Sequence, residues 1–345
     1  MAGINRIAGE QEHATGARAF GLMFALVVLL VLGVNAVAIR LSPVSERTFD
    51  GRTVATKWAL ASAGAPAGGV VVIGDSSGNF AVETTVLEER LGVGARNYCT
   101  YGRFLNLGAG WFLDHALKDA DAPPAVVLVV MGSRTFALEA DGFTFASIPA
   151  AFGGWSERIP YVGLPAAEVL QFAAARLFPL YAQHRSFEGG IRKGLWHIDG
   201  SRLPIGPGGT SVLPRAYPNG VAPFAEKVLG EIAAMGDGPI PSVRDRAAMK
   251  GLVQAAEERG FDLVFVDGPV WEGLADREEH RAFLAKIHGF MDEICEGSER
   301  AQRLPGGLQV FPREVMENPF HLTGAAAGVY SAELTDRLRE LGLPR

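Results

Sequence analysis

The sequence is poor in cysteine and has no excess of basic residues. Its 345 residues include two cysteines, Cys99 and Cys295, and neither lies in a CxxC or Cys/His spacing typical of a zinc site. We therefore expect no metal centre, and we expect unpaired thiols because both cysteines fall in apolar segments. Lys and Arg number 32 against 38 Asp and Glu, a net charge of -6. This balance argues against nucleic acid as a partner, because phosphate binding requires a clustered basic surface.

Long uncharged runs are also scarce, with one exception near the N-terminus. Residues 19–39 carry no charge, and a helix of that length spans the core of a bilayer. A cleaved signal peptide is the alternative interpretation, since Ala36-Val37-Ala38 resembles a small-residue cleavage site. We favour an uncleaved transmembrane anchor over residues 19–39, because the run is longer than a usual signal-peptide core. Residues 1–18 then form a short cytoplasmic tail.

Both interpretations export the rest of the chain. The flanking charges do not decide the orientation, because Arg40, Arg47 and Arg52 follow the apolar run. The short tail and the absence of a second run of spanning length favour export. We therefore expect a single-pass protein of the inner (cytoplasmic) membrane, with the residues from Leu41 onward extracytoplasmic.

Beyond the anchor, the pattern predicts a tether over residues 40–69 and a folded domain over residues 70–345. The tether is rich in Pro, Ser and Ala, with one weak helical patch around Trp58. In the domain, short apolar strands alternate with helices, which is typical of parallel βαβ units. The predicted strands are Val70–Ile73, Val93–Cys99, Ala125–Met131, Leu263–Val266 and Leu308–Phe311. The expected fold is a three-layer α/β/α sandwich with a short parallel sheet.

The alternation is interrupted by residues 135–240, which are rich in Gly, Pro and aromatic residues. Helical patterns occur there at Ala166–Phe178 and Phe224–Met235. An excursion of this length is usually a functional elaboration over a site, and we interpret it as an insertion of that kind. The alternative is a neutral or partly disordered insertion.

The first strand ends in a turn that favours a nucleophile. Ser76 follows Gly74 and Asp75, so it lies at the carboxyl end of the sheet, where open α/β folds bind ligands. The amides that open the next helix stabilise negative charge beside it. A simpler interpretation is that Asp75, Ser76 and Ser77 cap the helix. The Gly-x-Ser-x-Gly elbow of α/β-hydrolases also fits residues 74–78, but that fold requires several earlier strands, and only an anchor and tether precede this turn.

A histidine lies at the corresponding place near the C-terminus. His321 stands between the last predicted strand and the final helix, Ala325–Leu341. Because parallel strands present their carboxyl ends at one edge, we expect His321 to lie beside Ser76, as a Ser–His pair requires. The alternative role for His321 is to cap the final helix.

Gly74-Asp75-Ser76, together with His321-Leu322 three residues after Asn318, resembles the SGNH (GDSL-type) hydrolase superfamily. The anchor, the insertion and the closing His-Leu-Thr-Gly stretch are similar to membrane-anchored bacterial members. These include proteins that work beside membrane-bound O-acyltransferases in envelope polysaccharide modification, and the DltD-like proteins of teichoic acid alanylation. The resemblance covers residues 70–134 and 241–342.

The resemblance implies that Ser76 is the nucleophile and His321 the general base. The family's acid stands three residues before the histidine, where this chain has Asn318. Asparagine orients an imidazole but does not neutralise the imidazolium, so a slow triad is one expectation. The other is that Glu314 or Glu317 reaches the histidine instead.

The resemblance also implies an oxyanion hole at the same edge. Its donors are the amide of Ser76 and that of Gly102 in the turn after the second strand, with Asn106–Gly110 as a rival inside a helical pattern. The family's third block offers an asparagine, but this chain has Gly132-Ser133-Arg134. Either the oxyanion hole is incomplete, or Ser133 or Arg134 supplies the missing donor.

These residues, taken with the resemblance, predict an acyl-ester enzyme without a metal or organic cofactor. The resemblance implies an O-acetyltransferase or esterase that acts on a cell-envelope polysaccharide through an acyl-enzyme, with a membrane-bound O-acyltransferase as a partner. The competing hypothesis is a catalytically weak glycan-binding or assembly protein, favoured by Asn318 and by Gly132-Ser133-Arg134.

Overall fold

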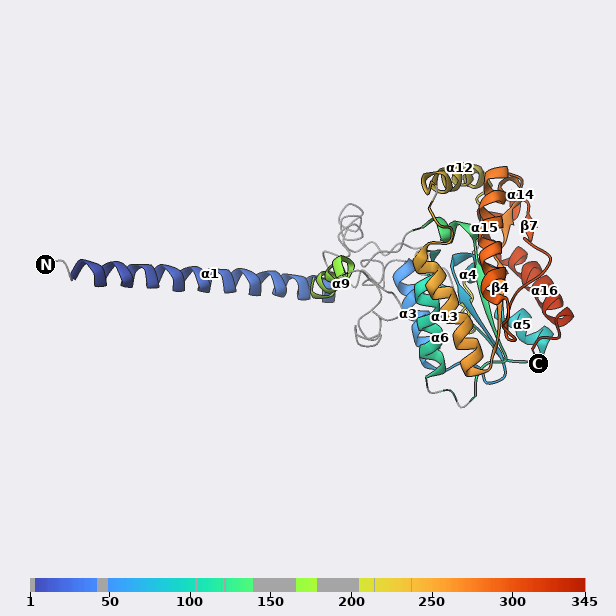
Figure 1. Cartoon of the computed structure of the whole chain (residues 1–345), viewed down its shortest axis with the longest axis horizontal. Coiled ribbons are helices and arrows are strands. Elements are labelled where there is room, and N and C mark those ends of the chain that lie inside the picture. The colour runs from blue at the N-terminus through green and yellow to red at the C-terminus, as the bar shows by residue number, and fades with distance from the viewer. Residues whose placement is uncertain are drawn as a thin grey trace.

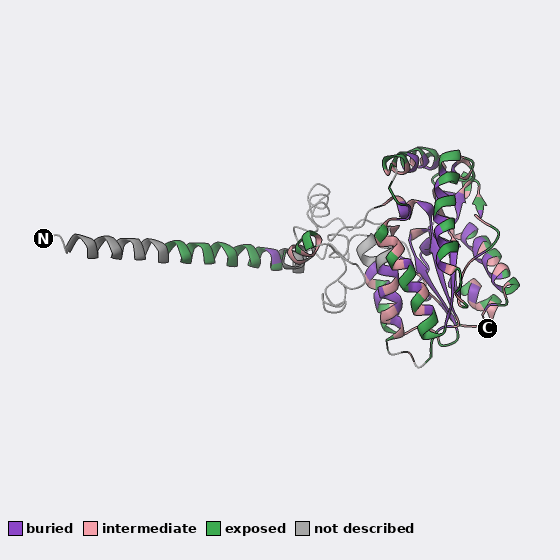
Figure 2. Cartoon of the chain, viewed as in Figure 1, coloured by how far each residue is buried: buried purple, intermediate pink, exposed green. Residues whose placement is uncertain are grey.

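In the computed structural model, a long N-terminal helix, α1 (Ile4–Leu41), precedes an α/β domain (Figure 1). Within α1, Ala19–Val37 is long and apolar enough to cross a membrane, and it is almost entirely exposed (Figure 2). Among the described residues, no second helix meets that criterion. The structure describes residues 4–41, 49–102, 105–118, 120, 122–138, 166–178, 205–213, 215–236 and 238–344.

The domain is built on a five-stranded parallel sheet with the strand order β2-β1-β3-β4-β6. Its three central strands are Val- and Ile-rich and buried on both faces, as parallel strands covered by helices require. The five strands are β1 (Val70–Gly74), β2 (Ala95–Asn97), β3 (Val126–Met131), β4 (Asp262–Asp267) and β6 (Ala301–Arg303).

Helices cover both faces of the sheet (Figure 1). Alternate strand residues face opposite sides: Val71 and Ile73 belong to one core cluster, and Val70 and Val72 to the other. The first cluster includes residues of α3 (Phe49–Ser62), α6 (Leu105–Leu117), α13 (Val243–Arg259) and α15 (Glu278–Cys295). The second includes residues of α4 (Ser76–Ala81), α5 (Thr84–Leu91) and α16 (Gly324–Glu340). The predicted three-layer α/β/α architecture is confirmed.

One predicted strand is wrong in its pairing. Val310–Phe311 forms β7, which pairs with β5 (Val270–Trp271) in a separate two-stranded ribbon. The fifth strand of the main sheet is β6, where Ala301 pairs with Leu263. Its Ala-Gln-Arg sequence has little apolar character because β6 is a short edge strand, so hydrophobic pattern does not reveal it.

The predicted tether over residues 40–69 also needs correction, because α3 is part of the domain. Val54, Trp58 and Ala61 are buried on one face of this helix. The Trp58 ring lies 4.4 Å from the Trp111 ring, centroid to centroid, and stacks on His115 at 3.9 Å. The folded unit therefore begins before Val70. The apolar face was hard to recognise because polar residues, including Lys57, share the buried side.

Replacing Trp58 with alanine is expected to lower the free energy of unfolding by about 3–5 kcal/mol, the usual cost of removing a buried tryptophan. Thr56→Ala, at an exposed position of the same helix, is the control and is expected to change stability by less than about 0.5 kcal/mol. Urea unfolding followed by circular dichroism measures both. Equal stabilities would mean that α3 is a tether after all.

The predicted insertion is described in part. It contains α9 (Ala166–Leu177) and α12 (Pro218–Ala234), close to the two predicted helical patches. Residues 139–165 and 179–204 lie outside the described residues. From residue 205 the chain returns to the domain, and α12 packs against β8 (Met316–Asn318) and α15.

Candidate active site

Ser76 is the first residue of α4, two residues after the end of β1. β1 ends at Gly74, where a side chain would collide with the backbone of β3, since a Cβ atom there would lie 2.0 Å from the Val130 carbonyl oxygen. The helix then begins at Ser76 itself. Asp75 is the N-cap, and its Oδ1 accepts a hydrogen bond of 2.8 Å from the Ser77 amide. Asp75 therefore does the capping, and the Ser76 hydroxyl is left for another partner.

That partner is His321. Its Nε2 lies 2.8 Å from Ser76 Oγ, although 245 residues separate the two in the chain. His321 opens β9 (His321–Leu322), which pairs with β8 in an antiparallel hairpin, so the histidine is in a short strand rather than a simple loop. The Phe80 ring lies 4.7 Å from the imidazole and packs against it. The structure thus brings the predicted nucleophile and base into hydrogen-bond contact.

Two side chains reach the other imidazole nitrogen. Glu317 Oε2 lies 3.2 Å from His321 Nδ1, and Asn318 Nδ2 lies 2.7 Å from the same atom. Asn318 Oδ1 accepts a hydrogen bond of 2.9 Å from the Phe320 amide, so its carbonyl is turned away from the histidine. Glu314 is exposed and pairs with Arg313 at 3.1 Å. Of the two glutamates considered from sequence, Glu317 is the one that contacts the histidine.

The surroundings of Glu317 favour its ionised form. Its hydrogen bond with His321 holds the pKa of the Glu317 carboxyl below its usual value, against burial, which raises it. Asn318 Nδ2 adds a second hydrogen bond of 2.7 Å to Oε2. A carboxylate beside Nδ1 orients the ring and stabilises the imidazolium that forms when the serine loses its proton.

The two neighbours of Nδ1 favour opposite tautomers of His321. If Nδ1 carries the proton and donates to Glu317, Nε2 is free to accept the Ser76 proton, as a general base must. If Nδ1 accepts from the Asn318 amide, Nε2 carries the proton and donates to Ser76 instead. The relative strength of the hydrogen bonds from Glu317 and Asn318 to Nδ1 therefore decides in what fraction of molecules His321 Nε2 is able to accept the Ser76 proton.

Asp75 joins the turns that follow β1 and β3. One carboxylate oxygen accepts from the amide and hydroxyl of Ser77. The other accepts from the Gly132 amide at 2.9 Å and from the Thr135 hydroxyl. This network, which sequence reasoning missed, fixes the edge of the sheet. It also engages the Gly132 amide, so that amide is directed at Asp75 and away from any substrate.

Both side chains proposed to replace the family's asparagine have other partners. Ser133 Oγ lies 2.7 Å from Nε2 of the buried His280, whose pKa is lowered to about 4 by burial. Arg134 forms two hydrogen bonds, of 2.7 and 2.9 Å, with Glu231 of α12. Neither side chain is directed at Ser76 by these contacts. The His280 pairing had no signal in the sequence, because it joins residues 147 positions apart.

The remaining predicted oxyanion donors are the amides of Ser76 and Gly102. Gly102 lies in the turn after β2, and a Cβ atom there would be 3.5 Å from Thr135 Oγ1, so this turn contacts the Asp75 network. The rival stretch, Asn106–Gly110, lies within α6. The amides from Gly108 onward are used by the helix itself, whereas those of Asn106 and Leu107 lie in its first turn and have no intrahelical acceptor, so Gly102 and these two amides all stay predicted donors.

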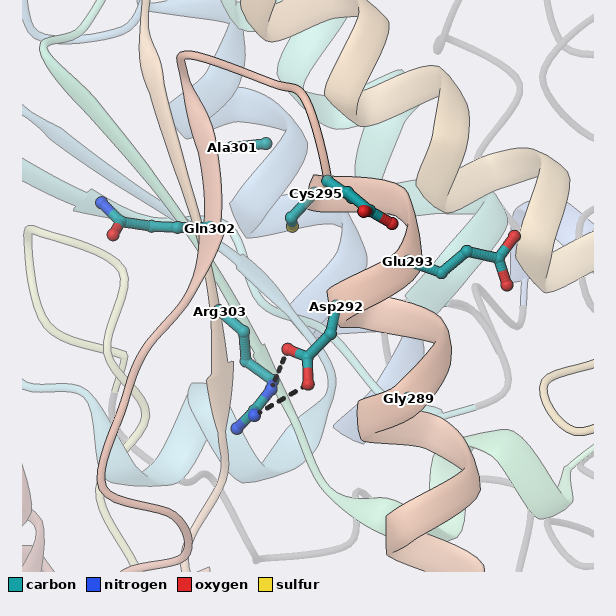
Figure 3. A pocket seen from close by; sticks show the side chains of 8 residues that line it. Gly289, Asp292, Glu293, Cys295, Ala301, Gln302 and Arg303 are labelled. Atoms are coloured by element: carbon teal, nitrogen blue, oxygen red, sulfur yellow. Dashed lines mark hydrogen bonds and ion pairs between the residues drawn. The ribbon is translucent and has the colours of Figure 1, made fainter.

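A hollow of about 590 Å³ lies apart from these residues, between the end of α15 and β6 (Figure 3). Two of the residues that line it, Arg303 and Asp292, are joined by hydrogen bonds of 2.8 and 3.1 Å. None of the predicted site residues lines this hollow. In the part of the chain that the structure describes, no group of three or more His, Cys, Asp or Glu side chains is arranged to hold a metal ion.

Comparisons with known proteins do not assign the chain to a family. No family model matches it, and no curated protein matches it. Among solved structures, it is similar to an acetyl xylan esterase, Est2A, from the rumen bacterium Butyrivibrio proteoclasticus, with 11% sequence identity and a TM-score of 0.32. The match covers 81% of this chain and 65% of that esterase, so the chain spans less than two thirds of its length. This distant likeness leaves the geometry around Ser76 as the basis for a function.

Proposed function

We propose that the chain is a serine-dependent acyl-ester enzyme of the SGNH type. The observation that carries the proposal is the 2.8 Å contact between Ser76 Oγ and His321 Nε2, with Glu317 beside Nδ1. A nucleophile, a base and an orienting acid in this order are what acyl transfer through a covalent intermediate requires.

In the proposed reaction, His321 Nε2 takes the Ser76 proton as Oγ attacks the carbonyl carbon of an acyl ester. The negative charge on the former carbonyl oxygen is stabilised by the amides of Ser76 and Gly102. The C–O bond to the leaving alcohol then breaks, and His321 returns the proton to that alcohol. A sugar hydroxyl or water attacks the acyl-Ser76 ester in the same way, which gives transferase or esterase activity respectively.

The substrate and location that we propose are a cell-envelope polysaccharide and the outer face of the inner membrane. The exposed apolar stretch Ala19–Val37 supports an anchor of this kind. The resemblance to membrane-anchored SGNH proteins supports acetyl as the acyl group and a membrane-bound O-acyltransferase as the partner. An anchored acyl-enzyme would receive and pass on acyl groups close to the membrane surface.

A second candidate function is that of a catalytically weak protein that holds a glycan or assembles an acylation complex. One observation favours it: Asp75 engages the Gly132 amide, while Ser133 and Arg134 are held by His280 and Glu231. Fewer donors then remain for an oxyanion. Losing one such donor typically lowers kcat by about 10²–10³.

Labelling with a fluorophosphonate probe separates the two candidates. An enzyme with an activated serine is expected to form one adduct, located at Ser76 by peptide mass spectrometry and absent from Ser76→Ala. Ser62 is the matched control, because its Oγ also lies 2.8 Å from a histidine nitrogen, His115 Nε2, but donates to the Trp58 carbonyl. Ser62→Ala is therefore expected to label like the parent. An unlabelled parent protein would favour the binding function.

A further inference from the structure

The segment with which the insertion returns to the domain, residues 205–213 (the return segment), is hydrogen-bonded to the elements that carry Ser76 and His321. On the serine side, the Ser211 amide and hydroxyl donate to the backbone and side-chain oxygens of Asn79, each at 3.1 Å. On the histidine side, the Gly324 amide donates to the Leu213 carbonyl at 3.3 Å. Asn79 lies three residues after Ser76 in α4, and Gly324 lies three residues after His321.

The return segment is packed too closely to be a loose lid. Residues 208–211 are buried, and Thr210 Oγ1 bridges the carbonyl of Val82 and the amide of Thr84. A Cβ atom at Gly208 would lie 2.0 Å from Thr84 Oγ1, and one at Gly209 would lie 2.3 Å from the Asn97 carbonyl oxygen. Both positions therefore require glycine, and the return segment is held in one conformation against the domain.

Lys57 of α3 holds the return segment in place through hydrogen bonds. Its ammonium group is fully buried and donates to the carbonyl of Gly209, to the carbonyl of Asn97 at 2.8 Å and to Asn97 Oδ1 at 3.3 Å. Three acceptors match the three N–H groups of an ammonium ion. Asn97 Nδ2 in turn donates to the carbonyls of Gly78 and Val82, both at 3.0 Å, which ties the same lysine to α4.

Burial of the Lys57 ammonium group costs free energy, which indicates that its hydrogen bonds to the return segment and to Asn97 have a specific role. Burial lowers the pKa of Lys57 to about 7, and the one titratable neighbour that opposes this effect is the buried Cys99. Within the described residues, no carboxylate forms an ion pair with Lys57. An apolar residue would pack in this place without that penalty, as replacement of buried charges in other proteins has shown.

We propose that Lys57 is a positioning residue for the proposed acyl-transfer reaction, which it serves by fixing the return segment and, through it, the distance between Ser76 Oγ and His321 Nε2. The inference rests on the function proposed above. It assigns a role to α3 and to the part of the insertion that the structure describes. The N-terminal region and the insertion then meet at one buried ammonium group, which touches neither reacting atom.

The test compares Lys57→Met with the parent in the detergent-solubilised full chain, using aryl acetate hydrolysis. A reacting pair displaced by about 1 Å loses on the order of 10²-fold in rate, so kcat is expected to fall by about 10- to 100-fold while KM changes by less than about twofold. Ser211→Ala is expected to act in the same direction. The double variant is expected to be no slower than the slower single variant, because both changes loosen one segment.

Trp58→Phe is the matched control, because the Trp58 ring packs against Trp111, Phe112 and His115 of α6. It is expected to lower stability while leaving kcat unchanged. If Lys57→Met and Ser211→Ala fold and keep the parental kcat, the positioning role is overturned while the proposed function stands. If the parent shows neither hydrolysis nor fluorophosphonate labelling at Ser76, the proposed function fails instead.

Hydrogen exchange tests the return segment independently of activity. In Lys57→Met, peptides covering residues 205–213 and 321–324 are expected to exchange about tenfold faster or more, because the Ser211 and Gly324 amides lose their fixed acceptors. A peptide from β3 serves as the internal reference. Unchanged protection of both peptides would overturn the inference even in a protein that has no esterase activity. Where Lys57→Met does not fold, Ser211→Ala provides the same comparison.

Discussion

Replacing His321 with alanine is expected to lower kcat for aryl acetate hydrolysis by a factor on the order of 10⁴ to 10⁶. The imidazole accepts the Ser76 proton in the first step and returns it to the leaving alcohol. Without this base, the hydroxyl is a poor nucleophile at neutral pH. Because His321 is at the start of a two-residue strand whose ladder bonds are backbone bonds, the variant is expected to fold.

His115 provides the control for this experiment. Its Nε2 also lies 2.8 Å from a serine hydroxyl, that of Ser62, but the pair is on the surface formed by α3 and α6. His115→Gln is therefore expected to keep parental kcat, within about twofold. Parental activity in His321→Ala would show that the Ser76–His321 contact is not the catalytic one, and would favour the glycan-binding function.

The central part of the fold was predictable because short apolar runs in the sequence indicate buried strands. β1, β3 and β4 each contain a continuous apolar run rich in Val, and their alternation with helices indicates a parallel sheet. The edges were not predictable in this way. β6 has a half-exposed Ala-Gln-Arg sequence, and α3 buries a lysine and a threonine beside its tryptophan. Patterns based on apolar residues miss such elements, because tertiary contacts decide them.

The candidate site was predictable to the extent that topology controls it. Ser76 follows a strand of the parallel sheet, as expected, but His321 reaches it from the β8–β9 hairpin, because the predicted last strand pairs outside that sheet. The orientation of the Asn318 amide was not predictable, because it depends on the turn that presents the Phe320 amide. The contacts of Lys57 were also not predictable from the sequence, since they join it to residues 40 and 152 positions away.

Glu317→Gln is expected to lower kcat by a factor on the order of 10² to 10⁴. The substitution keeps the size of the side chain but removes the charge that stabilises the His321 imidazolium. It also replaces a carboxylate by an amide, whose oxygen is a weaker acceptor and whose NH2 group only donates, so Asn318 Nδ2, 2.7 Å from Nδ1, favours the unreactive tautomer more strongly. Glu314→Gln is the control and is expected to be silent, because Glu314 is exposed and pairs with Arg313. The rates are measured with aryl acetate over the neutral pH range.

The double variant Glu317→Gln/Asn318→Asp is expected to recover most of the lost activity. The new carboxylate keeps one oxygen on the Phe320 amide and places the other where Asn318 Nδ2 lies, 2.7 Å from His321 Nδ1. It therefore accepts the Nδ1 proton and supplies the missing charge. In the single variant Asn318→Asp, two carboxylates share this space, and their repulsion raises the pKa of one of them. The gain in kcat over the parent is therefore expected to be smaller than the gain of the double variant over Glu317→Gln. If Glu317→Gln retains parental kcat, Glu317 is not the acid. If the double variant is no faster than Glu317→Gln, the tautomer of His321 does not limit the reaction.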